Sequence, residues 1–120
     1  MDTEPKFQEL IDYLLEVLAS LEKERRKRMT YSDFAEIVDL PIRTVTSMFE
    51  EGRKPIRANA EKIAVALMSN RILEILGYEP IDPAELRFRH VYRSLAPHQK
   101  AAINRQLDSF TKKEGASLPV

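Results

Sequence analysis

The sequence has no cysteine, only three glycines and no long apolar run among its 120 residues. Without cysteine the chain can form neither a disulfide nor a thiolate metal site. The three glycines form no loop of the kind that cradles phosphate. No apolar run approaches the roughly 20 residues that a membrane-spanning helix needs. We therefore expect neither a disulfide-stabilised fold nor a nucleotide-binding loop, and we expect no membrane partner.

The sequence also offers little for catalysis or metal binding. Its only histidines, His90 and His98, lie on either side of a predicted helix break and lack the spacing of a metal-ligand pair. Acidic residues are frequent, but they fall on predicted solvent faces, where nothing would raise the pKa of a carboxylate. We expect no catalytic residue, metal or cofactor, and we predict that the protein is not an enzyme.

Net charge is absent as well, since the chain has 19 basic and 19 acidic residues. This balance at first argues against nucleic acid as a partner. The charge is unevenly distributed, because residues 87–120 carry seven basic and two acidic residues. A second basic run, KERRKR, covers Lys23–Arg28. Either stretch is typical of a solvated helix face, but together they leave a nucleic-acid partner open.

The length of the chain allows one domain with an appended element, and two full domains would not fit. Its first residues, MDTEPKFQEL, have neither the basic start nor the apolar stretch of a signal peptide. We therefore expect a cytoplasmic protein.

Apolar residues recur at helical spacing along nearly the whole chain, and no segment alternates as a β-strand would. A first helix is expected from Thr3 into the basic run, with apolar residues as far as Leu21. Four more helices are expected before residue 78, so the predicted fold class is all-α. Their boundaries are indicated by Thr30 as an N-cap, Asp39-Leu40-Pro41 as a break, Gly52 as an end, Ser69 or Asn70 as a cap and Gly77 as a C-cap.

Two further helices are expected after residue 80. Asp82 as N-cap with Pro83 in the first turn predicts the start of one. A break near Pro97 precedes the other, and the polar segment 112–120 is expected to be disordered. Their apolar stripes contain Phe88, Val91 and Leu95 in the first helix, and Ile103, Leu107 and Phe110 in the second.

The two helices expected between residues 30 and 52 have the features of a DNA-binding helix-turn-helix. Such a motif needs a short turn, a small residue where the helices cross and a polar outer face on the second helix. Ala35 is small at the expected crossing, and Asp39-Leu40-Pro41 forms the turn. The face of the second helix opposite Val45, Met48 and Phe49 carries Arg43, Thr44, Thr46 and Ser47.

From about Leu18 to Gly77 the chain resembles the Cro/CI-type helix-turn-helix proteins, the lambda-repressor-like or Xre family. The resemblance is carried by MTYSDFAEIV, LPIRTVTSMFEEG, RKPIRANAEKIAVAL and ILEILGYEP, in this order. Tyr31 stands where the family has glutamine, and Asp39 stands where the turn usually has glycine. The resemblance implies a five-helix DNA-binding domain in residues 1–79, followed by a two-helix extension.

The resemblance also implies which side chains contact DNA. Arg43 is expected to be the main base-reading residue, because a bidentate arginine on guanine is worth about 1–3 kcal/mol of discrimination. For Tyr31 the alternative is that its ring packs on the next helix. For Thr44 and Thr46 the alternative is that they only occupy the helix surface. The full expected set is Ile42, Arg43 and Ser47 for bases, and Thr30, Tyr31, Thr44, Thr46, Arg53, Lys54 and Arg57 for phosphates.

We therefore predict a sequence-specific regulator that binds double-stranded DNA, a repressor acting as a homodimer on a palindromic operator in a bacterial or phage nucleoid. Residues 80–111 are expected to form a helical hairpin that either dimerises or packs on its own domain. The alternative is a helix-turn-helix module that binds a protein, such as an antitoxin or the partner of another regulator. The neutral charge and Glu50-Glu51 favour it. The expected dimer contacts are Phe88, Val91, Leu95, Ile103, Leu107 and Phe110.

Overall fold

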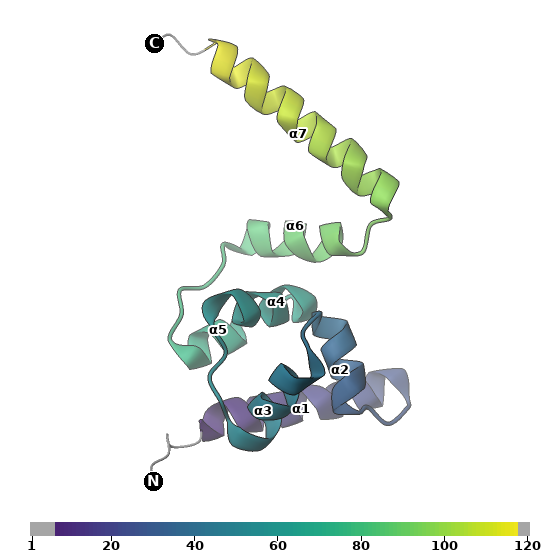
Figure 1. The fold of residues 1–120 in the computed structure, drawn as a ribbon, viewed down its shortest axis with the longest axis vertical. Coiled ribbons are helices and arrows are strands. Elements are labelled where there is room, and N and C mark those ends of the chain that lie inside the picture. The colour runs from purple at the N-terminus through teal and green to yellow at the C-terminus, as the bar shows by residue number, and fades with distance from the viewer. Residues whose placement is uncertain (1–6, 118–120) are drawn as a thin grey trace.

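The computed structural model describes residues 7–117, with side chains described for residues 7–107. Within this range all regular structure is helical, which confirms the all-α prediction. Residues 3–6 of the first predicted helix and residues 118–120 of the predicted tail lie outside the described residues. The helices are α1 (Gln8–Arg25), α2 (Tyr31–Val38), α3 (Ile42–Glu51), α4 (Arg57–Leu67), α5 (Arg71–Leu76), α6 (Pro83–Arg93) and α7 (Pro97–Ser117) (Figure 1).

The first five helices enclose one hydrophobic core. α1 contacts α3 and α5, α2 contacts α3 and α4, and α4 contacts α5 (Figure 1). Each fully buried aliphatic or aromatic side chain contributes about 1.5–3 kcal/mol to folding. The apolar stripes predicted from the sequence supply these side chains, because residues three and four apart share one side of a helix. The largest are Leu10, Leu14, Phe34, Val38, Val45, Met48, Ile63, Ile72 and Leu73.

Helix α2 begins and ends where the sequence predicts. The Thr30 hydroxyl accepts a hydrogen bond from the N–H of Asp33 at 3.1 Å, and the Asp33 carboxylate accepts one from the N–H of Thr30 at 3.0 Å. The N–H of Thr30, which donates to the carboxylate, and then the Thr30 hydroxyl hold the pKa of Asp33 below its ordinary value. Asp39 ends the helix with φ at 60°, a left-handed conformation that glycine adopts most readily and that aspartate also tolerates. Pro41 then precedes α3.

Gly52 ends α3 at a point where the chain leaves no room for a side chain. Its φ is 61°, and a Cβ added to it would lie 2.7 Å from the backbone nitrogen of Phe7. The same Phe7 N–H donates to the carbonyl oxygen of Gly52 at 3.2 Å. The start of α1 and the end of α3 therefore meet backbone to backbone.

Asn70 connects the start of α5 to the loop before α6. It precedes α5 as predicted, but its amide does not cap that helix. Instead Nδ2 donates to the carbonyl oxygen of Ile81 at 2.8 Å, and Oδ1 accepts from the N–H of Ile81 at 2.9 Å. Ser69 supplies the local contact, since its hydroxyl accepts from the N–H of Arg71 at 3.2 Å. The loop before α6 is thus fixed by a residue eleven positions earlier.

Helix α6 packs on α4. It begins at the predicted cap, where the Asp82 carboxylate accepts from the N–H of Ala84 at 3.1 Å. On its inner side Leu86 is buried, and Nδ1 of His90 lies 2.8 Å from the carbonyl oxygen of Val65 in α4. One apolar side chain and several polar contacts therefore attach α6 to the body.

The hairpin expected for residues 80–111 is open in the structure. Helix α7 diverges from α6 and makes no extensive contact with another helix over the described residues (Figure 1). Near the turn, the Tyr92 hydroxyl donates to Oδ1 of Asn104 at 3.0 Å, and Lys100 lies over the Tyr92 ring. α7 continues to Ser117, into the segment 112–120 for which the sequence predicts disorder. No proline interrupts these turns, and a single glycine costs a helix only about 1 kcal/mol.

Candidate nucleic-acid interface

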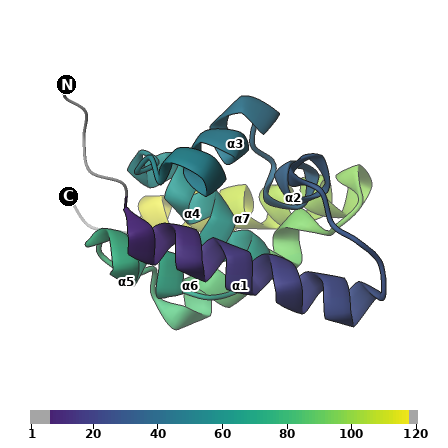
Figure 2. The ribbon, with the colours of Figure 1, turned by 90° about the horizontal axis from the view of Figure 1, so that it is seen from below.

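One side of α3 is packed on the body, and the other is open to solvent. Val45, Met48 and Phe49 are buried, as the sequence predicts. The ring of Tyr31 stacks on that of Phe49 with 4.6 Å between centroids, and Phe34 meets the same ring edge-on at 5.4 Å. These contacts fix α3 against α2, and Figure 2 shows α3 at the upper edge of the body.

The three side chains expected to contact bases share the open side of α3. Ile42 is 47% exposed, Arg43 is exposed and Ser47 is half-buried one turn later. Among the ion pairs of the described residues none involves Arg43. Glu50 is exposed on the same side, three residues after Ser47. The negative charge of Glu50 would repel a polyanion that approaches this side of α3.

The start of α3 adds backbone donors to this surface. Its N-cap is Pro41, whose side chain cannot accept a hydrogen bond from the first turn. The first N–H groups of a helix have no partner within the helix, and they carry a partial positive charge. Backbone N–H groups in such a position suit the phosphate oxygens of nucleic acid.

The hydroxyl residues expected to contact phosphate differ in what they already do. Thr30 is exposed, and its oxygen already accepts the capping bond described above, so a contact with phosphate would have to come from its O–H. Tyr31 is half-buried in its stack with Phe49, as the packing interpretation expected. Thr44 and Thr46 are half-buried on the two flanks of α3.

The loop from α3 to α4 carries two exposed cations. Arg53 lies 3.5 Å from a carboxylate oxygen of Glu51, and both side chains are largely exposed, so water screens the pair. The ammonium of Lys54 lies 4.7 Å from the centre of the Tyr78 ring. The Tyr78 hydroxyl donates to the carbonyl oxygen of Pro55 at 2.9 Å, which stabilises the loop. Sequence patterns did not indicate this role of Tyr78, because it lies 23 residues from its partner.

Arg57 is the expected phosphate residue that is most engaged elsewhere. Its Nε donates to Oε2 of Glu61 at 2.6 Å, and Nη2 donates to the carbonyl oxygen of Glu79 at 3.2 Å. Glu61 in turn accepts from Arg89 of α6 at 3.1 Å. The Arg57 bond, followed by that of Arg89, holds the pKa of the Glu61 carboxyl below its ordinary value, against the effect of partial burial. Arg57 therefore belongs to an ion-pair network between α4 and α6.

The described residues contain no cluster of three metal-binding side chains. His90 faces α4, and His98 is exposed on α7. Within the same range no helix has the length and apolarity needed to cross a membrane.

No protein-family model, curated protein or solved structure matches this chain. The resemblance to the Cro/CI-type proteins therefore depends on the quoted segments alone.

Proposed function

We propose that this chain is a sequence-specific regulator of transcription that binds double-stranded DNA. The observation that supports it best is the open side of α3, where Ile42, Arg43 and Ser47 are presented by a helix that α2 holds from behind. A helix of this kind enters the major groove with its first turns toward the base edges. The uncapped first turn of α3 and the exposed Arg53 and Lys54 would contact phosphates nearby.

The proposed regulator is a cytoplasmic homodimer that represses transcription from a palindromic operator. One helix in one major groove reads only a few base pairs, and a two-fold dimer places two such helices about 34–36 Å apart. Phe88 on α6 and Leu107 on α7 are exposed and lie outside the α1–α5 body, so they are available to a second copy. The side chain of Phe110, also expected in this contact, lies outside the described residues.

The experiment is selection of duplexes from a random pool, followed by titration of the selected duplex with Arg43→Ala. We expect a palindromic consensus and an affinity about 5- to 150-fold weaker for the variant, since a bidentate arginine is worth about 1–3 kcal/mol. Arg87→Ala, which removes an exposed arginine of α6, is the matched control and should bind as the native chain does. Affinity should also fall steeply with salt, by a log–log slope of about −0.9 per phosphate contact. Absence of duplex binding at low salt would overturn the proposal.

A second function, binding of a protein partner through α3, is favoured by Glu50. This carboxylate shares the open side with Arg43 and would approach the phosphate backbone of a bound duplex. Glu50→Gln separates the two functions. It should strengthen duplex binding if DNA is the partner, because a like charge is removed. If a protein is the natural ligand instead, the native chain should bind the duplex only weakly, and Glu50→Gln should leave that affinity unchanged.

A further inference from the structure

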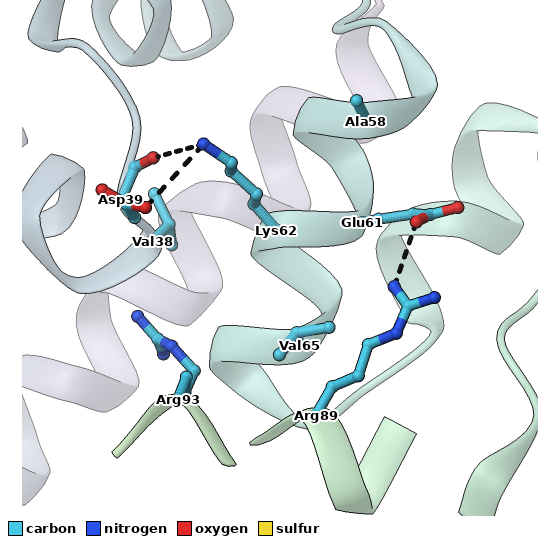
Figure 3. Close-up of a pocket in the computed structure, with 8 residues that line it drawn as sticks. All are labelled: Val38, Asp39, Ala58, Glu61, Lys62, Val65, Arg89 and Arg93. Carbon is cyan, nitrogen blue, oxygen red and sulfur yellow. Dashed lines mark hydrogen bonds and ion pairs between the residues drawn. The ribbon is translucent and has the colours of Figure 1, made fainter. Parts of the chain in front are cut away.

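A cavity of about 310 Å³ lies beside the turn between α2 and α3, where α6 crosses α4 (Figure 3). This volume is at the small end of the range of about 300–1,000 Å³ that is usual for ligand sites. Three cations line it, Lys62 from α4 and Arg89 and Arg93 from α6. Its apolar lining comes from Val38, Ala58 and Val65.

The charges around the cavity are only partly balanced. Arg89 is paired with two carboxylates, Glu61 at 3.1 Å and Glu85 in its own helix. The Lys62 ammonium lies 3.8 Å from Oδ2 of Asp39, and the lysine side chain is half exposed. Arg93 forms no ion pair with a carboxylate among the described residues. Positive charge is therefore in excess on the side where α2 ends.

Arg93 and Lys62 both bind the backbone at the end of α2. Arg93 donates to the carbonyl oxygen of Ile37, and Lys62 donates to that of Asp39 at 3.2 Å. Cations at the last carbonyls of a helix stabilise its negative end. A neutral carbonyl is a weaker partner for a cation than an oxyanion is. An anion that enters the cavity would therefore compete with these carbonyls for both cations, and with the Asp39 carboxylate for Lys62.

We propose that this cavity binds a small organic anion, an apolar body carrying one carboxylate or phosphate group. Its charged group pairs with Arg93 and Lys62, and its apolar body lies on Ala58 and Val65, next to the buried Val38. These cations hold the turn that precedes α3. Binding of the anion therefore changes how firmly this turn fixes α3 on the body. The resulting effect on operator affinity rests on the proposed function, whereas the binding itself does not.

The test is a titration of the methyl-labelled full chain with phenyl phosphate and with benzoate at constant ionic strength, followed by NMR. We expect saturable shifts of the methyl signals of Val38 and Val65 with at least one of the two anions, which also tells phosphate from carboxylate recognition. Benzyl alcohol, which lacks the charge, and inorganic phosphate, which lacks the apolar body, should bind about tenfold more weakly or worse.

Two variants tie the shifts to the cavity. The double substitution Lys62→Gln with Arg93→Gln should weaken binding about tenfold or more, and Ala58→Leu should block the cavity while keeping every charge. Lys100→Gln with Arg105→Gln removes two cations from α7 and should change nothing. The inference is overturned if neither anion shifts the two valines, or if the cavity variants bind as the native chain does. The Arg43→Ala result does not depend on either outcome.

Discussion

At the scale of single residues, two left-handed positions end helices for different reasons. Gly52 and Gly77 both have positive φ, at 61° and 79°. A Cβ at Gly52 would meet the backbone nitrogen of Phe7 at 2.7 Å, whereas a Cβ at Gly77 would have no atom within 4 Å. Gly52 is thus required by both conformation and space, and Gly77 by conformation alone.

Gly52→Ala should therefore destabilise the fold more than Gly77→Ala does. The left-handed conformation costs either alanine about 1 kcal/mol. At residue 52 the clash with a backbone atom adds about 1–3 kcal/mol, because α1 must move to relieve it. Denaturant unfolding of the two variants measures the difference, with Gly77→Ala as the matched control. Equal losses would show that the approach of α1 to α3 is not as close as described.

Local signals in the sequence predicted the helix ends well. Thr30, Asp39 and Gly52 end or begin their helices through bonds to residues at most five positions away, so their effect can be inferred from neighbouring residues. Asn70 and Tyr78 were not predicted in their observed roles. Their partners, Ile81 and Pro55, are 11 and 23 residues away, and only the packed fold brings them together.

At the scale of elements, α6 is attached to the body by the buried Leu86 and by polar side chains that contact α4. Arg89 contacts Glu61, and His90 contacts the backbone of Val65, while Phe88 and Val91 face outward, 49% and 52% exposed. The apolar spacing of this helix predicted correctly that it would form. It could not predict which side faces the body, because that choice depends on acceptors in α4.

The contacts between α4 and α6 also involve Arg57, a residue of the candidate interface whose ion pair the sequence analysis did not predict. The resemblance implied a phosphate contact for Arg57, and in the structure its guanidinium bonds to Glu61, one turn later in α4. The spacing of four residues between them could have indicated this pair. By contrast, the exposed positions of Ile42 and Arg43 followed directly from the apolar side of α3.

Glu61 should give stability a dependence on acid pH. Its folded pKa lies below the ordinary value of about 4.3, chiefly because Arg57 bonds to the carboxylate. The unfolded chain therefore binds the proton more tightly, and the contribution of Glu61 is complete above that value. It is lost as the pH falls below 4.3 and through the folded pKa.

Glu61→Gln should lower the free energy of unfolding at neutral pH. The difference in this free energy between the variant and the native chain should shrink as the pH falls below about 4.3. Denaturant unfolding measured across that range tests this. Glu36→Gln, at an exposed position of α2, is the control and should show no such convergence. A gap that stays constant in acid would mean that Glu61 acts through shape and not through charge.

At the scale of the whole molecule, α6 and α7 form an extension whose apolar surfaces have no partner in the described chain. Phe88 stacks on Tyr92 with 5.8 Å between centroids, but both belong to α6. Leu107 on α7 is 50% exposed. A stable dimer takes about 800 Å² from each partner, over about 20–30 residues. With 11 and 21 residues, α6 and α7 together are long enough to supply such an area.

Phe88→Glu should therefore dissociate the proposed dimer while leaving the α1–α5 body folded. Burial of a phenylalanine in an interface contributes about 2 kcal/mol, so the affinity of dimerisation should fall by at least a factor of about ten. Sedimentation velocity measures the change, and Arg87→Gln, which alters the charge by the same amount at the adjacent position, should leave the mass unchanged. On a palindromic duplex Phe88→Glu should lose affinity, whereas on a single half-site it should bind as the native chain does, because α3 is untouched. A native chain that sediments as a monomer at micromolar concentration, or a variant that stays dimeric, would show that these two helices serve another partner.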